Sequence, residues 1–389
     1  MGFYFGLTTE LMAIAAMGAV QWWLAYRVNS LIKSYLPPVP ARLLCVTVRI
    51  VVAAITLGLI LSVPHASRLP LTRFLGYLRG VSLLWAFTST AAWLIYRALR
   101  LFRWRSEEAD PTRRALLRTA GTAAVAAPFA LVGFGTFVER TAFGVREMDI
   151  PIPDLHHDLE GLRLVQISDI HLSPFLSERD FARVVDAANG LRAQVMFVTG
   201  DLISVRGDPL DACLDQLSRL RADAGVLGCL GNHEVYARTE EYTTVQAARM
   251  GISFLRGQAR RLQFGNATLN VGGVDYQKMN DRHHYLPGAE HMLSPGALNV
   301  LLSHNPDVFP VAAQQGWDFT LAGHTHGGQV NFEILHYGMN VARFYTPYVY
   351  GLYTAGRSSI YVTRGIGTIG MPARLGAPPE ISVLRLRKA

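Results

Sequence analysis

The sequence predicts an α/β fold in which two central sheets lie between layers of helices, a four-layer α-β-β-α sandwich preceded by a transmembrane helical region. Three observations support this prediction. Half of the residues are hydrophobic and only 17% are charged, and the apolar excess is concentrated in the first 140 residues. In the rest of the chain, apolar runs typical of buried strands alternate with helical patterns. Short polar motifs follow most of these runs, as expected where strand ends converge at one edge of a sheet.

We divide the chain into a membrane region (residues 1–140), a connector (141–160) and a soluble domain (161–389). The membrane region contains four apolar segments, each close to or above the roughly 20 residues needed to cross about 30 Å of hydrocarbon. These segments are Phe3–Tyr26, Leu43–Val63, Gly80–Tyr96 and Thr119–Val138. The alternative is a buried bundle in a soluble protein. Tryptophans and tyrosines near the segment ends favour the membrane, because such residues form belts at its interfaces.

Charge is distributed unevenly along the chain. Residues 1–150 hold 16 Lys and Arg against 7 Asp and Glu, whereas the remainder holds 21 against 22. Seven arginines lie between Arg97 and Arg118, and the positive-inside rule places this link in the cytoplasm. The soluble domain then lies outside the cytoplasm, and we expect a multi-pass protein of the cell membrane. The net charge of +8 is a topology signal, so we expect no nucleic-acid partner.

The segment Thr112–Arg118 resembles a twin-arginine export signal. It departs from that signal at Thr112 and Leu116, where Ser and Phe are usual. No convincing small-residue cleavage site follows the apolar run, so we expect a retained anchor. The alternative is that these arginines serve only as topology determinants. The three cysteines are too few for a disulfide framework.

The elements of the soluble domain can be placed in order. Strand-like runs lie at Leu162–Ile167, Val195–Val198, Val226–Leu230, Val300–Leu302 and Phe319–Ala322. Helical patterns lie at Asp180–Gly190, Pro209–Leu220 and Thr243–Met250. Short alternating runs between Ile252 and Val274 are typical of hairpins. Strands mixed with helices that cover both faces predict the sandwich.

Five polar motifs follow these runs and supply potential metal ligands. They are Asp169-Ile-His171, Gly200-Asp201, Gly231-Asn232-His233-Glu234, Ser303-His304 and Gly323-His324-Thr325-His326. Oxygen ligands mixed with imidazoles suit borderline divalent metals such as Mn, Fe and Zn. One ion needs fewer ligands than this, so we predict a site for two. Asp201 suits the shared position, since a carboxylate can bridge two metals. Individually these residues could be caps or satisfied core groups, but burying so many ionisable groups without metal would be costly.

In this order, the motifs resemble those of the calcineurin-like metallophosphoesterase superfamily, over roughly Leu162 to Leu386. Two tail segments, Tyr361–Thr368 and Arg374–Glu380, also look like the membrane-anchored bacterial branch. The resemblance implies ligands for a first metal (Asp169, His171, His326), ligands for a second (Asn232, His304, His324), a bridging ligand (Asp201) and an acid beside the leaving group (His233).

The resemblance also implies the chemistry of a metal-dependent phosphoester hydrolase. A hydroxide held between two cations would attack phosphorus, and His233 could donate a proton to the departing alkoxide. Many relatives carry an Asp three residues after the bridging Asp, to orient this histidine. Here Ser204 stands in that place. The orienting group could be Glu234 or a water, or be absent.

Two segments are candidates for substrate contacts. Aromatic residues between Phe332 and Tyr353 could contact an acyl chain or the bilayer surface, or could pack in the core. Arg364 and Arg374 could bind a phosphate or diphosphate through their guanidinium groups, with ordinary surface pairing as the alternative. His156, His157 and four other histidines fit no ligand position, and we interpret them as surface or loop residues.

We therefore expect a membrane-anchored phosphodiesterase or phosphatase that acts on a phosphoester of the envelope, with lipid-linked substrates included. One alternative is a lipid-nucleotide pyrophosphatase of the UDP-diacylglucosamine type, whose substrate would be cytoplasmic. Another is a non-catalytic interaction module on the same fold, which would be expected to have lost ligand histidines. The sequence does not predict the oligomeric state.

Overall fold

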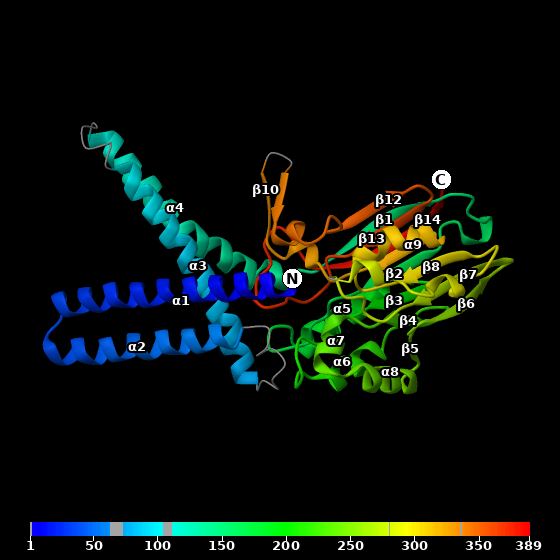
Figure 1. The fold of residues 1–389 in the computed structure, drawn as a ribbon, viewed down its shortest axis with the longest axis horizontal. Coiled ribbons are helices and arrows are strands. Elements are labelled where there is room, and N and C mark those ends of the chain that lie inside the picture. Colours follow the sequence, from blue (N-terminus) through cyan, green and yellow to red (C-terminus); the bar gives the residue numbers. More distant parts are fainter. Residues whose placement is uncertain (1, 63–72, 104–110, 280, 335–336) are drawn as a thin grey trace. The chain divides into compact units, whose positions relative to one another are not determined.

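The computed structural model describes residues 2–62, 73–103, 111–279, 281–334 and 337–389 (Figure 1). The chain divides into two compact units. The first comprises Met1–Val138 with Gly370–Ala373, and the second comprises Glu139–Ile369 with Arg374–Ala389.

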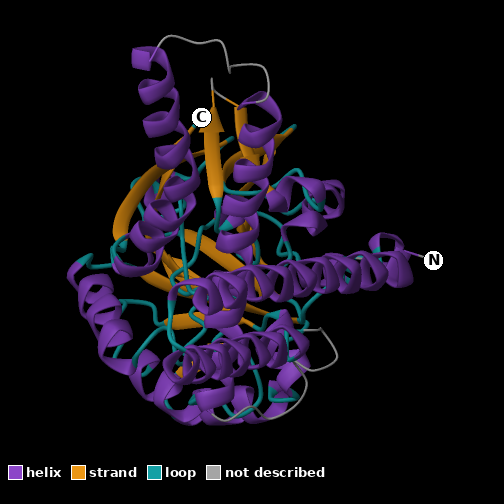
Figure 2. Cartoon of the chain, turned by 90° about the vertical axis from the view of Figure 1, so that its left-hand side faces the viewer, coloured by secondary structure: helices purple, strands orange, loops and turns teal. Residues whose placement is uncertain are grey.

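The first unit is built from four long helices, drawn in purple in Figure 2. They are α1 (Gly2–Tyr35), α2 (Pro38–Ile60), α3 (Arg73–Arg103) and α4 (Pro111–Phe137). All four are long and apolar enough to cross a membrane. Each begins before the apolar segment predicted for it, α1 and α3 also end beyond it, and α2 and α4 end at Ile60 and Phe137, short of the predicted Val63 and Val138. Hydropathy marks the length of chain that suits hydrocarbon, whereas polar residues at either end can continue the helix.

Polar and small residues join the helices of this unit. Gln21 of α1 donates to the Ser89 hydroxyl of α3 at 3.0 Å and accepts from the Trp85 indole at 3.1 Å. Gly58 of α2 lies against Ser82 of α3, where a Cβ atom would stand 2.2 Å from the Ser82 Oγ. Small residues and satisfied polar groups are typical of helix packing in membranes.

The second unit contains two six-stranded sheets. The first has the order β1 (Gly144–Ile152), β14 (Glu380–Lys388), β2 (Arg163–Ile167), β3 (Val195–Thr199), β4 (Val226–Cys229), β5 (Ile252–Phe254). The second has the order β12 (Gly351–Ala355), β13 (Ser358–Val362), β9 (Phe319–Ala322), β8 (Leu298–Leu302), β7 (Ala267–Gly273), β6 (Gln258–Phe264). A separate hairpin pairs β10 (Asn331–Ile334) with β11 (Tyr337–Asn340).

Helices cover the outer faces of the two sheets, which confirms the predicted four layers (Figure 1). The first sheet packs against α5 (Glu178–Gly190), α6 (Leu210–Leu217) and α8 (Glu240–Arg249). The second packs against α9 (Phe309–Gln315) and short turns. Between the sheets, side chains such as Phe197, Leu227 and Leu321 form a fully buried core.

The predicted connector, residues 141–160, contains a strand of the first sheet. Strand β1 pairs in parallel with β14 from Gly144↔Glu380 to Ile152↔Lys388. Ile150 and Ile152 are buried in the core between the sheets. The partner strand lies more than 200 residues away in the sequence, so local patterning gave little signal for this pairing.

Candidate metal centre

The five polar motifs lie where strands end. Strands β2, β3 and β4 run parallel to one another, and β8 runs parallel to β9. The motif residues follow these strands directly, and the last motif leads into a 3₁₀ turn, His326–Gly328. Parallel strands bring their carboxyl ends to one edge of a sheet. A short helix, α7 (Asn232–Ala237), begins within the third motif.

The structure brings the predicted ligands together in two adjoining groups. One group is Asp169, His171 and His326, and the other is Asp201, His304 and His324. Within each group the potential ligand atoms lie within 4.8 Å of one another. Oδ2 of Asp201 lies 3.5 Å from Nε2 of His171 and 3.0 Å from Nε2 of His304. A single carboxylate oxygen therefore faces both groups, as a bridging ligand must.

Two oxygen atoms of the predicted ligands are buried without a hydrogen-bond partner among the described residues. They are Oδ2 of Asp169 and Oδ1 of Asn232. Burying a polar atom without a partner is costly. A metal ion coordinated by these atoms would remove that cost. The chemistry and burial of the donor set therefore fit two divalent ions.

The backbone of the site is held in an uncommon conformation. Five ligand residues have left-handed φ angles between 47° and 75°: Asp169, His171, Asp201, His324 and His326. Such angles are uncommon for residues other than glycine, and they cluster at functional sites. Gly231 allows the closest approach, because a Cβ atom there would stand 2.1 Å from the Asp201 Oδ1.

Asp201 and His304 form a charged pair in the metal-free protein. Burial alone would lower the pKa of His304, but the charge and hydrogen bond of Asp201, together with the charge of Asp169, raise it to about 10. Burial would raise the pKa of Asp201, but the charges of His304 and His233 outweigh it and hold that pKa well below its usual range. Both shifts arise from the contact between the Asp201 carboxylate and the His304 imidazole, whose Oδ2 and Nε2 atoms lie 3.0 Å apart.

The histidines of the last motif are neutral and ready to coordinate. Burial, followed by the charge of His304, lowers the pKa of His324 to about 3. Burial, followed by the charges of His171 and Arg374, lowers the pKa of His326 well below its usual value. Metal ligation needs the uncharged imidazole.

Groups behind the ligands fix their orientation. Nδ1 of His304 lies 2.6 Å from the Thr199 carbonyl oxygen, and Nδ1 of His171 lies 3.1 Å from the Ser204 hydroxyl. Donation from Nδ1 leaves Nε2 free to coordinate, which is the usual arrangement of metal-binding histidines.

His233 lies next to this cluster. The group that orients it is a backbone carbonyl and not the Glu234 side chain considered in the sequence analysis. Its Nδ1 lies 2.5 Å from the Ser204 carbonyl oxygen. Glu234 instead accepts hydrogen bonds from three backbone N–H groups, those of Gly231, Asp201 and Leu202. Glu234 thus fixes the two motif loops rather than the histidine. Burial lowers the pKa of His233 to about 4.

The two candidate substrate-binding arginines occupy different environments. Arg374 is fully buried, and its guanidinium donates to the carbonyl oxygens of Gly367, Ala377 and Arg364. The donors of Arg374 thus hold the C-terminal loop together, and a substrate role for this residue stays a prediction. Arg364 remains a candidate. Its side chain is 17% exposed, its guanidinium lies over the Tyr350 ring at 4.5 Å, and its buried Nε has no hydrogen-bond partner among the described residues.

The aromatic segment after the last motif divides between core and surface. Tyr348 packs edge-on against Phe309 and Tyr353, which fits the core-packing alternative. Phe344 and Tyr345 are exposed. The side chains of Phe332 and Tyr337 lie outside the described set.

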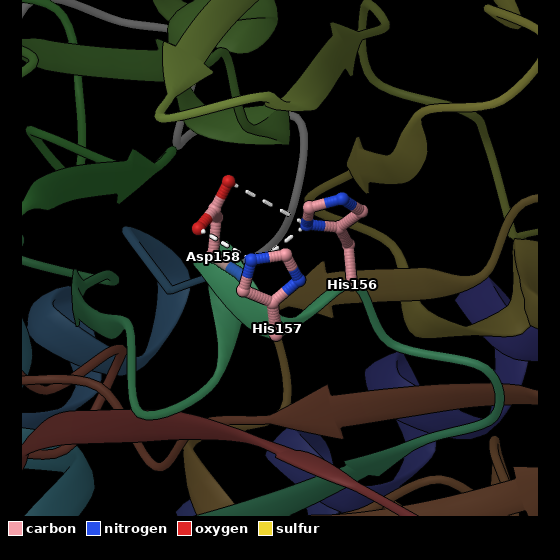
Figure 3. A group of neighbouring side chains, drawn as sticks. All are labelled: His156, His157 and Asp158. Atoms are coloured by element: carbon pink, nitrogen blue, oxygen red, sulfur yellow. Dashed lines mark hydrogen bonds and ion pairs between the residues drawn. The ribbon is translucent and has the colours of Figure 1, made fainter.

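A further histidine cluster lies away from the metal centre (Figure 3). His156, His157 and Asp158 precede β2, whereas Asp169 follows it, so the two clusters lie at opposite ends of that strand. Nδ1 of His156 accepts from the Asp158 backbone N–H and caps a 3₁₀ turn, His157–Leu159. The Asp158 carboxylate accepts from the Asn266 N–H at 2.7 Å. These contacts join the loop to the β6–β7 turn, and both histidines are exposed, as expected for surface residues.

Tyr276, which the sequence analysis did not single out, lies beside the second ligand group. Its ring centroid is 6.2 Å from that of His304 and 5.7 Å from that of His324. It follows β7 and belongs to no polar motif, so only the fold places it here.

Comparisons with known proteins show which proteins this chain is similar to. Residues 162–328 match the family model described as calcineurin-like phosphoesterase. A transmembrane protein with metallophosphoesterase domain from Bos taurus is 28% identical over 312 residues, which are 75% of this chain and 68% of that protein. An uncharacterized metallophosphoesterase of Campylobacter jejuni is 29% identical over 247 residues, 62% of this chain and 63% of the relative. The chain thus spans about two thirds of the length of these relatives.

Among solved structures, the chain is similar to a metallophosphoesterase from Sphaerobacter thermophilus. The TM-score is 0.24 and the sequence identity 18%, over 53% of this chain and 78% of that one.

Proposed function

We propose that residues 162–328, which match the calcineurin-like phosphoesterase model, belong to a domain that hydrolyses phosphoesters with two divalent metal ions, Mn, Fe or Zn. The observation that carries the proposal is the Asp201 carboxylate, one oxygen of which faces both ligand groups. The first ion would be held by Asp169, His171, Asp201 and His326, and the second by Asp201, Asn232, His304 and His324. When bound, the ions would neutralise the phosphoryl oxygens. They would also lower the pKa of a water, so that it could attack phosphorus as hydroxide at neutral pH.

His233 is the proposed proton donor to the leaving group. Its backbone N–H donates to Oδ1 of Asp201 at 2.9 Å, which ties it to the proposed bridging ligand. The Ser204 carbonyl accepts from Nδ1, so Nε2 is the nitrogen left to face a substrate. The free imidazole is neutral at pH 7 because burial lowers its pKa to about 4. An anionic substrate next to it favours the protonated form, which provides the proton for the departing oxygen.

The four apolar helices support anchoring in the cell membrane. With the arginine-rich link in the cytoplasm, the catalytic domain is extracytoplasmic. Phosphoesters of the envelope, lipid-linked ones included, are then the candidate substrates. Cytoplasmic nucleotide-lipids become candidates only with the opposite orientation. The non-catalytic alternative is disfavoured, because every predicted ligand histidine is retained in the two groups.

A substrate screen on the detergent-solubilised full chain tests the proposal. Monoesters, diesters and lipid diphosphates are assayed with and without added Mn. We expect Mn-dependent hydrolysis of at least one class, abolished by EDTA and restored by Mn. A protein that binds Mn and hydrolyses none of these classes would contradict the proposal.

A further inference from the structure

Two tyrosines and a methionine surround the side of the centre where the second ligand group meets His233. Tyr276 packs against both imidazoles of that group. In the same loop, Sδ of Met279 lies 3.1 Å from Nε2 of His324. Tyr236, on α7, presents its ring to His233 in an edge-on contact with a centroid distance of 5.6 Å.

The two tyrosines contact adjoining histidines of the site, Tyr236 the proposed acid His233 and Tyr276 the ligands His304 and His324. Tyr236 is 48% exposed, whereas Tyr276 is half-buried. The more exposed ring therefore packs on the proposed acid and the less exposed ring on the second ligand group.

We propose that Tyr236, Tyr276 and Met279 form a subsite for the leaving group, and that this subsite selects phosphoesters whose leaving group presents an uncharged, flat or apolar surface. The inference rests on the proposed function, because it takes His233 as the donor to the leaving oxygen. A group that receives a proton from His233 must lie beside it, where the Tyr236 ring packs against that histidine, while Tyr276 and Met279 contact the adjoining ligands His304 and His324. Such surfaces bind flat and apolar groups well. They offer no fixed positive charge to a leaving phosphate.

The ring of Tyr276 is the part of this residue that contacts the second ligand group. Tyr276→Phe keeps that ring and Tyr276→Leu removes it, so the pair of variants isolates the contribution of the ring.

Binding of two phosphonates tests the subsite without requiring turnover. The Mn-loaded, detergent-solubilised full chain is titrated calorimetrically with phenylphosphonate and with methylphosphonate. We expect wild-type protein to prefer the phenyl compound by about tenfold, the size of one or two good aromatic contacts. Tyr236→Ala and Tyr276→Leu should each reduce the preference to about threefold or less, whereas Tyr276→Phe should keep it.

A matched control and a metal measurement make the outcomes distinct. Tyr242, an exposed tyrosine of α8 whose hydroxyl donates to Asp211, is replaced by Ala as the control and should leave the preference unchanged. Manganese content is measured for each variant. If Tyr276→Leu binds less manganese than wild type, the test rests on Tyr236→Ala, because Tyr236 is exposed and its ring packs against His233.

No phenyl preference in Mn-loaded wild type, or an unchanged preference in Tyr236→Ala, would overturn the subsite. A phenyl preference that the variants abolish, in a protein that hydrolyses no phosphoester, would support the subsite and overturn the proposed function alone.

Discussion

The backbone carbonyl oxygen of Ser204 lies 2.5 Å from Nδ1 of His233. A carbonyl oxygen can only accept, so Nδ1 carries the proton in this contact and Nε2 is directed elsewhere. The Ser204 hydroxyl lies 3.1 Å from Nδ1 of His171 as well. One residue thus orients a proposed metal ligand with its side chain and the proposed acid with its backbone, at the position where many relatives carry an aspartate.

His233→Ala should slow alkyl phosphoesters, which have poor leaving groups, by about 10²–10⁴-fold, and activated aryl esters far less. Only a poor leaving group needs the proton. Ser204→Ala is the matched control, since it removes the hydroxyl but keeps the carbonyl, and it should preserve the difference between the two ester classes. The measurement is kcat/KM for both classes. Equal losses for both in His233→Ala would show a metal or structural role instead.

Metal binding should release about one proton per chain near pH 7. The pKa of His304 is about 10 in the metal-free protein because Asp201 and Asp169 outweigh the effect of burial. A metal must displace that proton, so its apparent affinity should rise with pH below this value. Calorimetric titration with Mn in buffers of different ionisation enthalpy measures the number released. A value near zero would mean that His304 does not coordinate.

Arg374 and Arg364 should affect different properties. Arg374→Met leaves three carbonyl oxygens without their buried donor, and it should destabilise the domain by about 3–5 kcal/mol. Arg364→Gln should change thermal stability little and raise KM for the phosphoester by about tenfold, because a charge-assisted contact is lost. Thermal unfolding and steady-state kinetics of both variants check this. A loss of stability in Arg364→Gln without a change in KM would exclude the substrate contact.

Many strands and helices of the fold could be predicted from local sequence patterns. The elements that could not be predicted depend on contacts between residues far apart in the sequence. The strand at Phe319–Ala322 begins and ends as predicted, because an apolar run between polar residues marks a buried strand well. Strand β1 was missed because its order comes from pairing with β14 at the other end of the chain. The helix predicted to continue to Leu220 ends at Leu217, since helix ends depend on capping contacts that composition does not fix.

The site shows the same division. The structure brings six Asp and His residues of the motifs together in two groups, and their assignment as metal ligands stays a prediction. The orientation of His233 could not be predicted, because it depends on a backbone carbonyl, to which any residue contributes equally. The burial of Arg374 and the position of Tyr276 depend on how distant loops pack, so the sequence carried no signal for either.

The distribution of arginines should determine the orientation of the chain in the membrane. A periplasmic-type phosphatase reporter fused after Ala389 should be active, and a reporter that needs the cytoplasm should be silent there. The physical reason is that seven arginines precede a single uncharged apolar segment before the catalytic domain. The reverse pattern would contradict this orientation and favour the lipid-nucleotide pyrophosphatase alternative.

The metal content of active protein tests the two-metal centre most directly. Elemental analysis of purified wild type should find two equivalents of divalent metal per chain, with activity rising as the second is filled. Asp201→Ala should remain in the membrane, bind fewer ions and lose hydrolysis, because both groups share that carboxylate. One equivalent or none in fully active wild type would contradict a centre bridged by Asp201.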